Sequence, residues 1–375
     1  MAAESSSFSL TSQMSTIPDD TTRRLAEIWR KLLHIDSVGL DQNYFDLGGD
    51  SSIAVQLFNQ IDSIFNVKLP LATLFDAPTV AELAKVVRRK SAEANWSSLV
   101  PIQRAGSRPP LFCVHGAGGN VLIYQNLSRH LGPDQPVYGL QCQGLDGKQP
   151  LVARVEDMAA IYVREIQQIQ PQGPYFLAGY CMGGSIAYEI AQQLRAEGEA
   201  VAMVALFDTI NWSKVTKRSR TSRLKYQMQR LWFHLRNFVL LNSQEKVRFV
   251  REKWNELKRR AIVWRGSFRG AFTRSDKSDQ SKSLLLSKIW KMHDAAALHY
   301  VPRPLDARIV AFRPLKQYSM VGDTFEHWDK LALRGQDVVT LPVYPAGMLV
   351  EPFVQKLATT LRQHMDTLSC VELSR

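Results

Sequence analysis

The chain has 375 residues, 45% of them hydrophobic and 22% charged, which allows two or three domains and is typical of a globular protein. It contains no run of 18 uninterrupted apolar residues and no basic and apolar leader at its start, so neither a transmembrane helix nor a secretory signal is predicted. The cysteines lie far apart and form no C-x-x-C pair, which predicts a reducing cytoplasm, no disulfide framework and no metal site.

The net charge of +12 is concentrated in one segment. Residues 214–291 hold 22 Lys and Arg against 5 Asp and Glu, a balance of +17. A basic block of this kind fits a nucleic-acid site. Apolar residues recur within it at three- and four-residue steps, however, which is typical of amphipathic helices with charged outer faces. The helical interpretation is therefore favoured, and neither nucleic acid nor membrane is expected as a partner.

The N-terminal part of the chain predicts a flexible tail, a small helical domain and a linker. Residues 1–18 are rich in Ser and Thr, and residues 19–92 contain amphipathic helical patterns and a short turn-rich piece, "PLATLFDAP". Asp50 or Ser51 is placed to cap the second long helix, while Thr79 and Glu82 form a capping box for the last. Residues 93–109 mix Ser, Ala, Gly and Pro without periodicity, as a linker does.

From residue 110 to 370 short apolar runs alternate with helical segments. The strand candidates are "LFCVHG", "PVYGLQ", "PYFLAGY", "AMVALFD", "ARIVAF" and "DVVTLPV". Alternation of this kind predicts a largely parallel sheet with helices on both faces. The basic segment, about 212–290, interrupts the rhythm as an inserted helical lid would.

The first motif, "YFDLGGDSS", places two glycines and a serine before a predicted helix. This arrangement presents the Ser51 hydroxyl at an open helix start, where a large group can be attached, although a plain capping serine fits the same local pattern. "DQNYFDLGGDSSIAVQL" resembles the modification site of acyl and peptidyl carrier domains, and "LPLATLFDAPTVAELA" extends the similarity. The resemblance implies that a separate transferase attaches 4'-phosphopantetheine to Ser51. Asp41, Asp46 and Asp50 around the serine then fit a surface that docks on basic partners.

The second motif, "GYCMGG", follows an apolar run and precedes a helical one. Its Gly-x-Cys-x-Gly spacing is that of a nucleophile elbow, with Cys181 at the position where serine is usual. The glycines fit this assignment because the strained turn needs small residues on both sides of the nucleophile. A buried structural cysteine is the alternative. We expect the helix that begins near Met182 to lower the pKa of the Cys181 thiol through its dipole.

Two further turns supply partners for this elbow. "LFCVHGAGGN" ends a predicted strand with a glycine-rich turn, where the Ala117 N–H together with that of Met182 would form an oxyanion hole. His115 is expected to shape this turn, with direct proton transfer as the less favoured alternative. "VALFDT" ends another strand with Asp208, where an orienting acid would sit or where the residue would merely cap the next segment.

These segments together resemble the thioesterase domains of the α/β-hydrolase fold that end non-ribosomal peptide and polyketide synthetases. The similarity runs from "VPIQRAGSRPPLFCVHGAGGN" through "GPYFLAGYCMGGSIAYEIAQQL" to "GMLVEPFVQKLATTL". The resemblance implies a four-helix carrier domain followed by an α/β-hydrolase domain with a lid, acting in secondary-metabolite biosynthesis. Its implied partners are upstream synthetase modules or a loading enzyme, a phosphopantetheinyl transferase and an acyl or peptidyl substrate.

One position departs from the family pattern. In the thioesterase family the general base is a histidine shortly before the last helix. The corresponding position of this chain holds Pro345, in "VYPAGMLVEPFV". His327 is the first substitute and His299 the second, although a lone histidine beside aromatic residues is more often structural. We therefore expect Cys181 to accept the acyl chain and to release it to an amine or a thiol, by cyclisation or by slow hydrolysis. The alternative is a catalytically silent domain that binds and presents the loaded carrier.

Overall fold

The computed structural model describes residues 19–89, 97–145, 147, 149–211, 277–314, 326–343 and 347–372. The chain divides into two compact units, residues 1–94 and residues 95–375. The expected tail, most of the expected lid and Pro345 lie outside the described residues.

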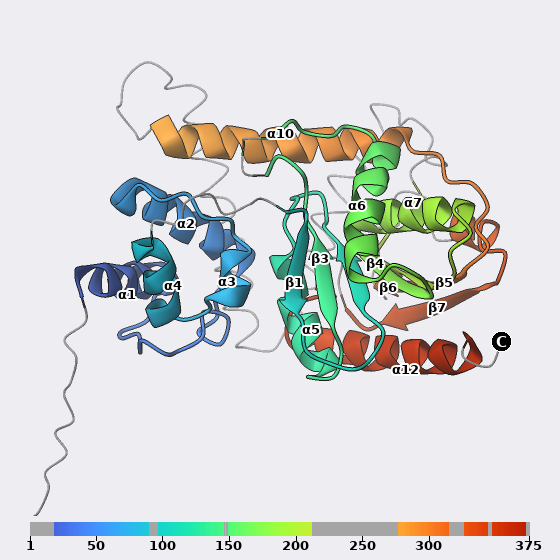
Figure 1. Cartoon of the computed structure of the whole chain (residues 1–375), viewed down its shortest axis with the longest axis horizontal. Coiled ribbons are helices and arrows are strands. Elements are labelled where there is room, and N and C mark those ends of the chain that lie inside the picture. Colours follow the sequence, from blue (N-terminus) through green and yellow to red (C-terminus); the bar gives the residue numbers. More distant parts are fainter. Residues whose placement is uncertain are drawn as a thin grey trace, which may run out of the picture. The chain divides into compact units, whose positions relative to one another are not determined.

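The first unit is a small helical domain (Figure 1). Its helices are α1 (Asp20–Leu33), α2 (Ser51–Phe65), α3 (Thr73–Asp76) and α4 (Val80–Arg88). Asp50 caps α2 through a hydrogen bond from the Ile53 N–H to its carboxylate at 2.8 Å. Thr79 caps α4 by accepting from the Glu82 N–H at 3.2 Å. The three predicted helices and both predicted caps are therefore present. The piece expected to be turn-rich contains the short helix α3, which completes the four helices that the resemblance implies.

An aromatic pair anchors the core of this unit. Trp29 of α1 and Tyr44 of the loop before α2 are both buried, with ring centroids 5.2 Å apart in an edge-to-face arrangement. Apolar residues of α1, α2 and α4 surround them. The loop that precedes Ser51 is therefore anchored by the packing of Tyr44 in the core, in addition to the hydrogen bonds within the loop.

The second unit is built on one sheet with strand order β1-β3-β2-β4-β5-β6-β7. The strands are β1 (Leu99–Gln103), β2 (Leu111–Val114), β3 (Val137–Leu140), β4 (Tyr175–Tyr180), β5 (Val201–Phe207), β6 (Arg308–Pro314) and β7 (Gln336–Leu341). Only the β1–β3 pairing is antiparallel. All seven residues of β5 are buried, as expected for a central parallel strand covered on both faces.

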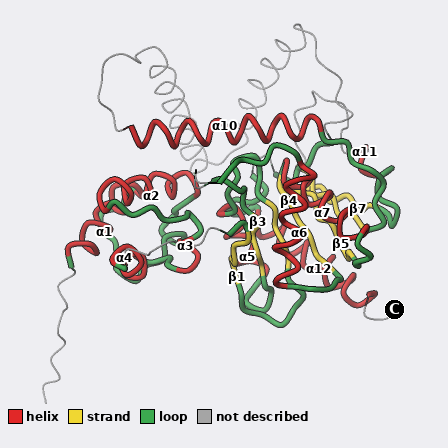
Figure 2. Tube along the Cα trace, turned by 45° about the horizontal axis from the view of Figure 1, so that its top comes forward, coloured by secondary structure: helices red, strands yellow, loops and turns green. Residues whose placement is uncertain are grey.

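Helices cover both faces of the sheet (Figures 1 and 2). The longer ones are α5 (Gln125–Leu131), α6 (Val155–Ile169), α7 (Met182–Ala196), α10 (Lys277–His299) and α12 (Val354–Glu372); α11 (Glu326–Asp329) is short, and the 3-10 turn η1 (Leu122–Tyr124) precedes α5. Helices α6 and α7 pack together on one face, and α5 and α12 pack together on the other. The predicted parallel-rich sheet with helices on both faces is confirmed.

Two boundaries differ from the sequence expectation. Residues 99–103, expected as linker, form the edge strand β1, because their backbone pairs with β3 despite the absence of a clear apolar alternation. The lid was expected to end near residue 290, but α10 continues unbroken to His299. The part of the expected lid from 277 onward is thus one helix that extends into the domain core, where Ile289 and His293 are fully buried.

Candidate active site

The elbow carries Cys181 between β4 and α7. Its backbone has φ 54° and ψ −119°, a strained conformation for a residue with a side chain. A Cβ added to Gly183 would overlap the carbonyl oxygens at the end of β2, and one added to Gly179 would overlap the Gly183 carbonyl. The turn therefore tolerates only glycine at these places. The elbow conformation predicted from the glycine spacing is present.

The sheet topology gathers the predicted site residues at one edge. Strands β2, β4 and β5 are neighbours, with Val114 opposite Gly179 and Tyr180 opposite Phe207. His115, Cys181 and Asp208 directly follow these three strands. Because the carboxyl ends of parallel strands meet at the same edge, the glycine-rich turn, the elbow and the acid share that edge.

The predicted lowering of the Cys181 pKa is wrong. Burial of the sulfur is the largest influence, and the Asp208 carboxylate adds to it, so the pKa rises to about 11; the hydrogen bond from the Met182 N–H acts the other way but is weaker. A buried thiolate loses its hydration, and a neighbouring anion repels it. At pH 7 only about one thiol in ten thousand is then ionised. This cysteine needs a base for efficient attack.

Asp208 lies directly beyond β5 with φ 47°. Its N–H donates to the Phe312 carbonyl at 2.9 Å, which fixes the backbone beside β6. Burial raises the pKa of its carboxyl to about 6, so the group is still mostly ionised at neutral pH. A partly buried carboxylate at this place can orient an imidazole and stabilise its charged form.

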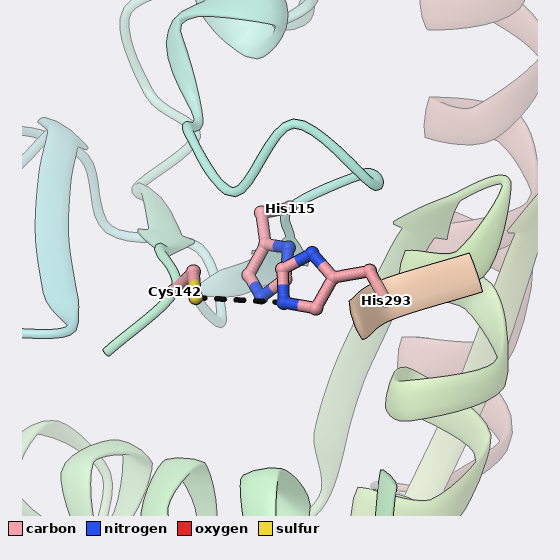
Figure 3. Close-up of side chains that lie close together, drawn as sticks. All are labelled: His115, Cys142 and His293. Carbon is pink, nitrogen blue, oxygen red and sulfur yellow. Dashed lines mark hydrogen bonds between the residues drawn. The ribbon is translucent and has the colours of Figure 1, made fainter. Parts of the chain in front are cut away.

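Two buried histidines, His115 and His293, lie side by side and contact the glycine-rich turn Gly116–Gly119 (Figure 3). His115 Nδ1 lies 2.7 Å from the Gly116 carbonyl oxygen, and His293 Nδ1 lies 2.9 Å from that of Ala117. Burial lowers the pKa of His115 to about 3, and His293 adds to this effect. His115 is therefore neutral and shapes the turn, as its position in the sequence predicts.

The expected substitute bases are only partly described. His327 belongs to α11, but its side chain lies outside the described residues. His299 is exposed, and its Nδ1 lies 2.7 Å from the Ala295 carbonyl of its own helix, which is a structural contact. Within the described part of the chain, no histidine nitrogen makes a hydrogen bond to Cys181 or Asp208.

Two residues of α10 were missed by the sequence reasoning. His293 contacts the turn Gly116–Gly119, and the Asp294 carboxylate contributes to the raised pKa of Cys181. Both lie more than a hundred positions beyond the elbow, in a helix that begins within the expected lid and continues past its expected end. No local sequence motif marks these two residues. They reach the site because α10 passes the edge of the sheet at which the parallel strands end.

The predicted attachment residue, Ser51, is the first residue of α2 and is half-buried. Gly48 has φ 87°, and a Cβ on Gly49 would overlap the Tyr44 ring, so both glycines are needed for the approach to the helix. The Tyr44 hydroxyl donates to the Asp50 carbonyl at 3.0 Å. A serine hydroxyl beside the first N–H groups of a 15-residue helix fits a phosphodiester.

Comparison with known families identifies both units. Residues 23–87 match the family described as "Phosphopantetheine attachment site", and residues 109–285 match "Thioesterase domain". The chain joins a carrier domain to a thioesterase-type domain. Carrier domains of this family hold 4'-phosphopantetheine covalently.

The similar curated proteins are large synthetases. The chain is 41% identical over 184 residues to a dimodular nonribosomal peptide synthase of Bacillus subtilis (strain 168), and 44% identical over 187 residues to malpibaldin synthetase of Mortierella alpina. Each match covers 49% of this chain but only 8% and 3% of those proteins. The didomain therefore corresponds to a small part of its relatives.

Solved structures support the fold assignment. A holo four-domain nonribosomal peptide synthetase, AB3403, bound to AMP and glycine, matches with a TM-score of 0.56 and 26% identity over 96% of this chain and 27% of its own. The NocB thioesterase domain, in covalent complex with a fluorophosphonate nocardicin G analogue, matches over 72% of this chain and 100% of its own, with a TM-score of 0.52 and 20% identity. Among the described residues, no helix is long and apolar enough to cross a membrane.

Proposed function

We propose that the didomain releases an acyl or peptidyl chain from its own carrier through an acyl intermediate on Cys181, in secondary-metabolite biosynthesis. One observation carries the proposal. The chain holds Cys181 in a strained elbow, beside the partly buried Asp208 and the glycine-rich turn, and joins this site to a carrier domain. Cytoplasmic location, loading by upstream synthetase modules or a loading enzyme, and modification by a phosphopantetheinyl transferase belong to the same proposal.

Ser51 is the proposed attachment residue. Its position at the start of α2, after two conformationally required glycines, supports this role. When bound, 4'-phosphopantetheine supplies a thiol that carries the chain as a thioester. The exposed carboxylates Asp41, Asp46 and Asp50 surround the serine and are suited to basic partner surfaces.

The chemistry at the elbow is a transthioesterification. The Cys181 thiolate attacks the carbonyl carbon of the incoming thioester, and the Ala117 and Met182 N–H groups are the proposed donors to the oxygen that gains negative charge. As the tetrahedral centre collapses, the bond from carbon to the carrier sulfur breaks, and the departing thiolate takes the proton that the base removed from Cys181. The chain is then a thioester of Cys181.

His327 is the proposed base, oriented by Asp208. Its helix α11 is tied to the site, because the neighbouring Trp328 is buried and donates from Nε1 to the Thr209 carbonyl at 3.2 Å. Thr209 directly follows Asp208. A base is required because the thiol pKa of about 11 leaves almost no thiolate at neutral pH.

Release is proposed to favour an amine, a thiol or an internal nucleophile over water. Each acceptor attacks the acyl carbon, and the Cys181 sulfur departs and regains a proton from the acceptor. Water is the poorest acceptor because it is the weakest of these nucleophiles and depends most on a general base at the moment of attack, and the expected histidine slot holds Pro345. Slow hydrolysis is the residual reaction.

A silent presenting domain is the alternative. A domain that only presents the carrier does not need a cysteine at positive φ. This conformation costs roughly 1–3 kcal/mol and persists where function requires it. The strain at Cys181 favours the catalytic proposal.

Intact-protein and peptide mass spectrometry test the proposal. Ser51 is loaded by a phosphopantetheinyl transferase with an acyl pantetheine group, and the acyl mass is followed with time. We expect it to leave the Ser51 peptide and to appear on the Cys181 peptide before release. Cys181→Ala is the matched control and should retain the group on Ser51.

Two outcomes would contradict the proposal. The first is release from Cys181→Ala at the wild-type rate, which would remove the covalent step. The second is an acyl group that stays on Ser51 in the wild type with all acceptors present, which would favour the presenting domain. His327→Gln should slow the transfer at least about tenfold, as the loss of a general base does.

A further inference from the structure

We infer that His293 of α10, with Cys142 behind it, is a positioning residue for the oxyanion donors. The inference rests on the proposed function, since those donors act when the acyl group reaches Cys181. The supporting observation is a series of buried contacts. Cys142, in the segment after β3, contacts His293 of α10, and His293 contacts Ala117 in the turn Gly116–Gly119.

The tautomer of His293 follows from its neighbours. Nδ1 lies 2.9 Å from the Ala117 carbonyl oxygen, which can only accept, so Nδ1 carries the hydrogen. Nε2 is then a bare acceptor, and the Cys142 sulfur lies 3.4 Å from it (Figure 3). Burial raises the pKa of Cys142 to about 12, so the thiol is protonated. Its one hydrogen has two acceptors within reach, Nε2 of His293 and the Gln143 carbonyl at 3.1 Å.

His115 repeats the same pattern one residue earlier in the turn. Its Nδ1–H donates to the Gly116 carbonyl at 2.7 Å, and its Nε2 accepts from the Tyr162 hydroxyl at 2.8 Å. The rings of His115 and His293 are stacked, with centroids 4.9 Å apart and an interplanar angle of 25° (Figure 3). Two neutral imidazoles therefore hold two consecutive carbonyls.

Holding a carbonyl also aims an N–H. In a trans peptide the C=O of one residue and the N–H of the next belong to one plane and point in opposite directions. The Gly116 carbonyl is thus paired with the Ala117 N–H, and the Ala117 carbonyl with the Gly118 N–H. His115 fixes the first peptide plane, which carries the proposed Ala117 donor, and His293 fixes the second, so the backbone is held on both sides of Ala117.

Helix α10 contacts the turn at more than one point. An added Cβ on Gly118 would lie 3.5 Å from the Trp290 Nε1, and one on Gly119 would lie 3.4 Å from Ile289. Helix α10, which includes the last part of the expected lid, therefore packs on the turn Gly116–Gly119 and bonds to it. A shift of α10 would therefore change the direction in which the N–H groups of this turn point. In this way the position of α10 would affect the rate at which Cys181 is acylated.

The same three side chains have the composition of a metal site. The ligand atoms of His115, Cys142 and His293 lie within 4.8 Å of one another. Each Nε2 nevertheless already faces a thiol or a hydroxyl, so the observed contacts form a hydrogen-bond network. The Cys142 thiol shares its hydrogen with the Gln143 carbonyl, and the Tyr162 hydroxyl shares its hydrogen with the Gln141 carbonyl. The hydrogen-bond assignment accounts for both rings.

Acylation and alkylation of Cys181 separate positioning from a general structural role. Acylation by an octanoyl thioester of N-acetylcysteamine passes through an oxyanion, whereas alkylation by iodoacetamide does not. We expect His293→Leu to lower the acylation rate by at least about tenfold, less than the full loss of a donor, and to leave alkylation within about twofold. His293→Asn retains an N–H near the Nδ1 position and should recover most of the rate.

Cys142 supplies an independent pair of variants if His293→Leu does not fold. Cys142→Ser keeps a donor to Nε2 and should acylate like the wild type, while Cys142→Ala should be slower. Wild-type acylation by His293→Leu and Cys142→Ala would overturn the positioning role and leave the proposed function intact. Absence of acylation in a wild type that alkylates would overturn both. The positioning role would also be overturned if the purified chain held one equivalent of zinc and Cys142→Ser lost that zinc.

Discussion

At the scale of single residues, Cys181 is governed by opposing influences. Burial and the Asp208 charge disfavour the thiolate, while the Met182 N–H favours it. The sequence shows the helix start but not the burial, and burial is the larger effect. The cysteine is thus a latent nucleophile that depends on a base, rather than a thiolate that is ready at neutral pH.

The pH dependence of alkylation measures this balance. We expect the rate of iodoacetamide labelling at Cys181 to rise about tenfold per pH unit from 7 to 10, because the thiol pKa is about 11. Asp208→Asn removes a negative charge and should lower that pKa, so labelling at pH 8 should be about threefold to tenfold faster. A plateau below pH 8.5, or slower labelling in Asp208→Asn, would show that a cationic partner stabilises the thiolate.

At the scale of elements, the elbow joins β4 to α7 through glycines that leave no room for a side chain. This could be predicted, because the motif is local and its spacing has a steric cause. The other six strands, β2 to β7, were also predicted, from their apolar runs. The edge strand β1 was not, because its burial pattern is mixed and only its partner β3 makes it a strand.

Gly183→Ala tests the steric account of the elbow. The added methyl would overlap backbone oxygens of β2 and of the turn after it, which cannot move aside. We expect the free energy of unfolding of the thioesterase-type domain to fall by roughly 1–3 kcal/mol or more, as overpacking does. Gly118→Ala, with an ordinary 3.5 Å neighbour, is the control and should unfold nearly as the wild type does. Equal midpoints in chemical denaturation would contradict the account.

At the scale of the whole molecule, the chain has two units, each with its own core. One presents Ser51 and the other holds Cys181, so the carrier and the site should be separable by substitution. Loss of the carrier function should leave the chemistry of the elbow unchanged.

Ser51→Ala tests this separation. We expect it to abolish phosphopantetheinylation and carrier-dependent turnover, because it removes the proposed attachment hydroxyl, while acylation of Cys181 by a small soluble thioester continues at the wild-type rate. Ser52→Ala is the matched control and should still be modified. Modification of Ser51→Ala, detected by intact mass, would assign the attachment site elsewhere.

The sequence by itself determined the order of the two domains, the three longer carrier helices, the central strands and the elbow, because each depends on local spacing, capping or apolar runs. The tertiary structure decided the rest. It raised the pKa of Cys181 by burial and placed the carboxylate of Asp208 close to the sulfur. It also brought His293 from α10 to the turn Gly116–Gly119. These features depend on desolvation and on contacts between distant segments, which arise only when the chain is packed.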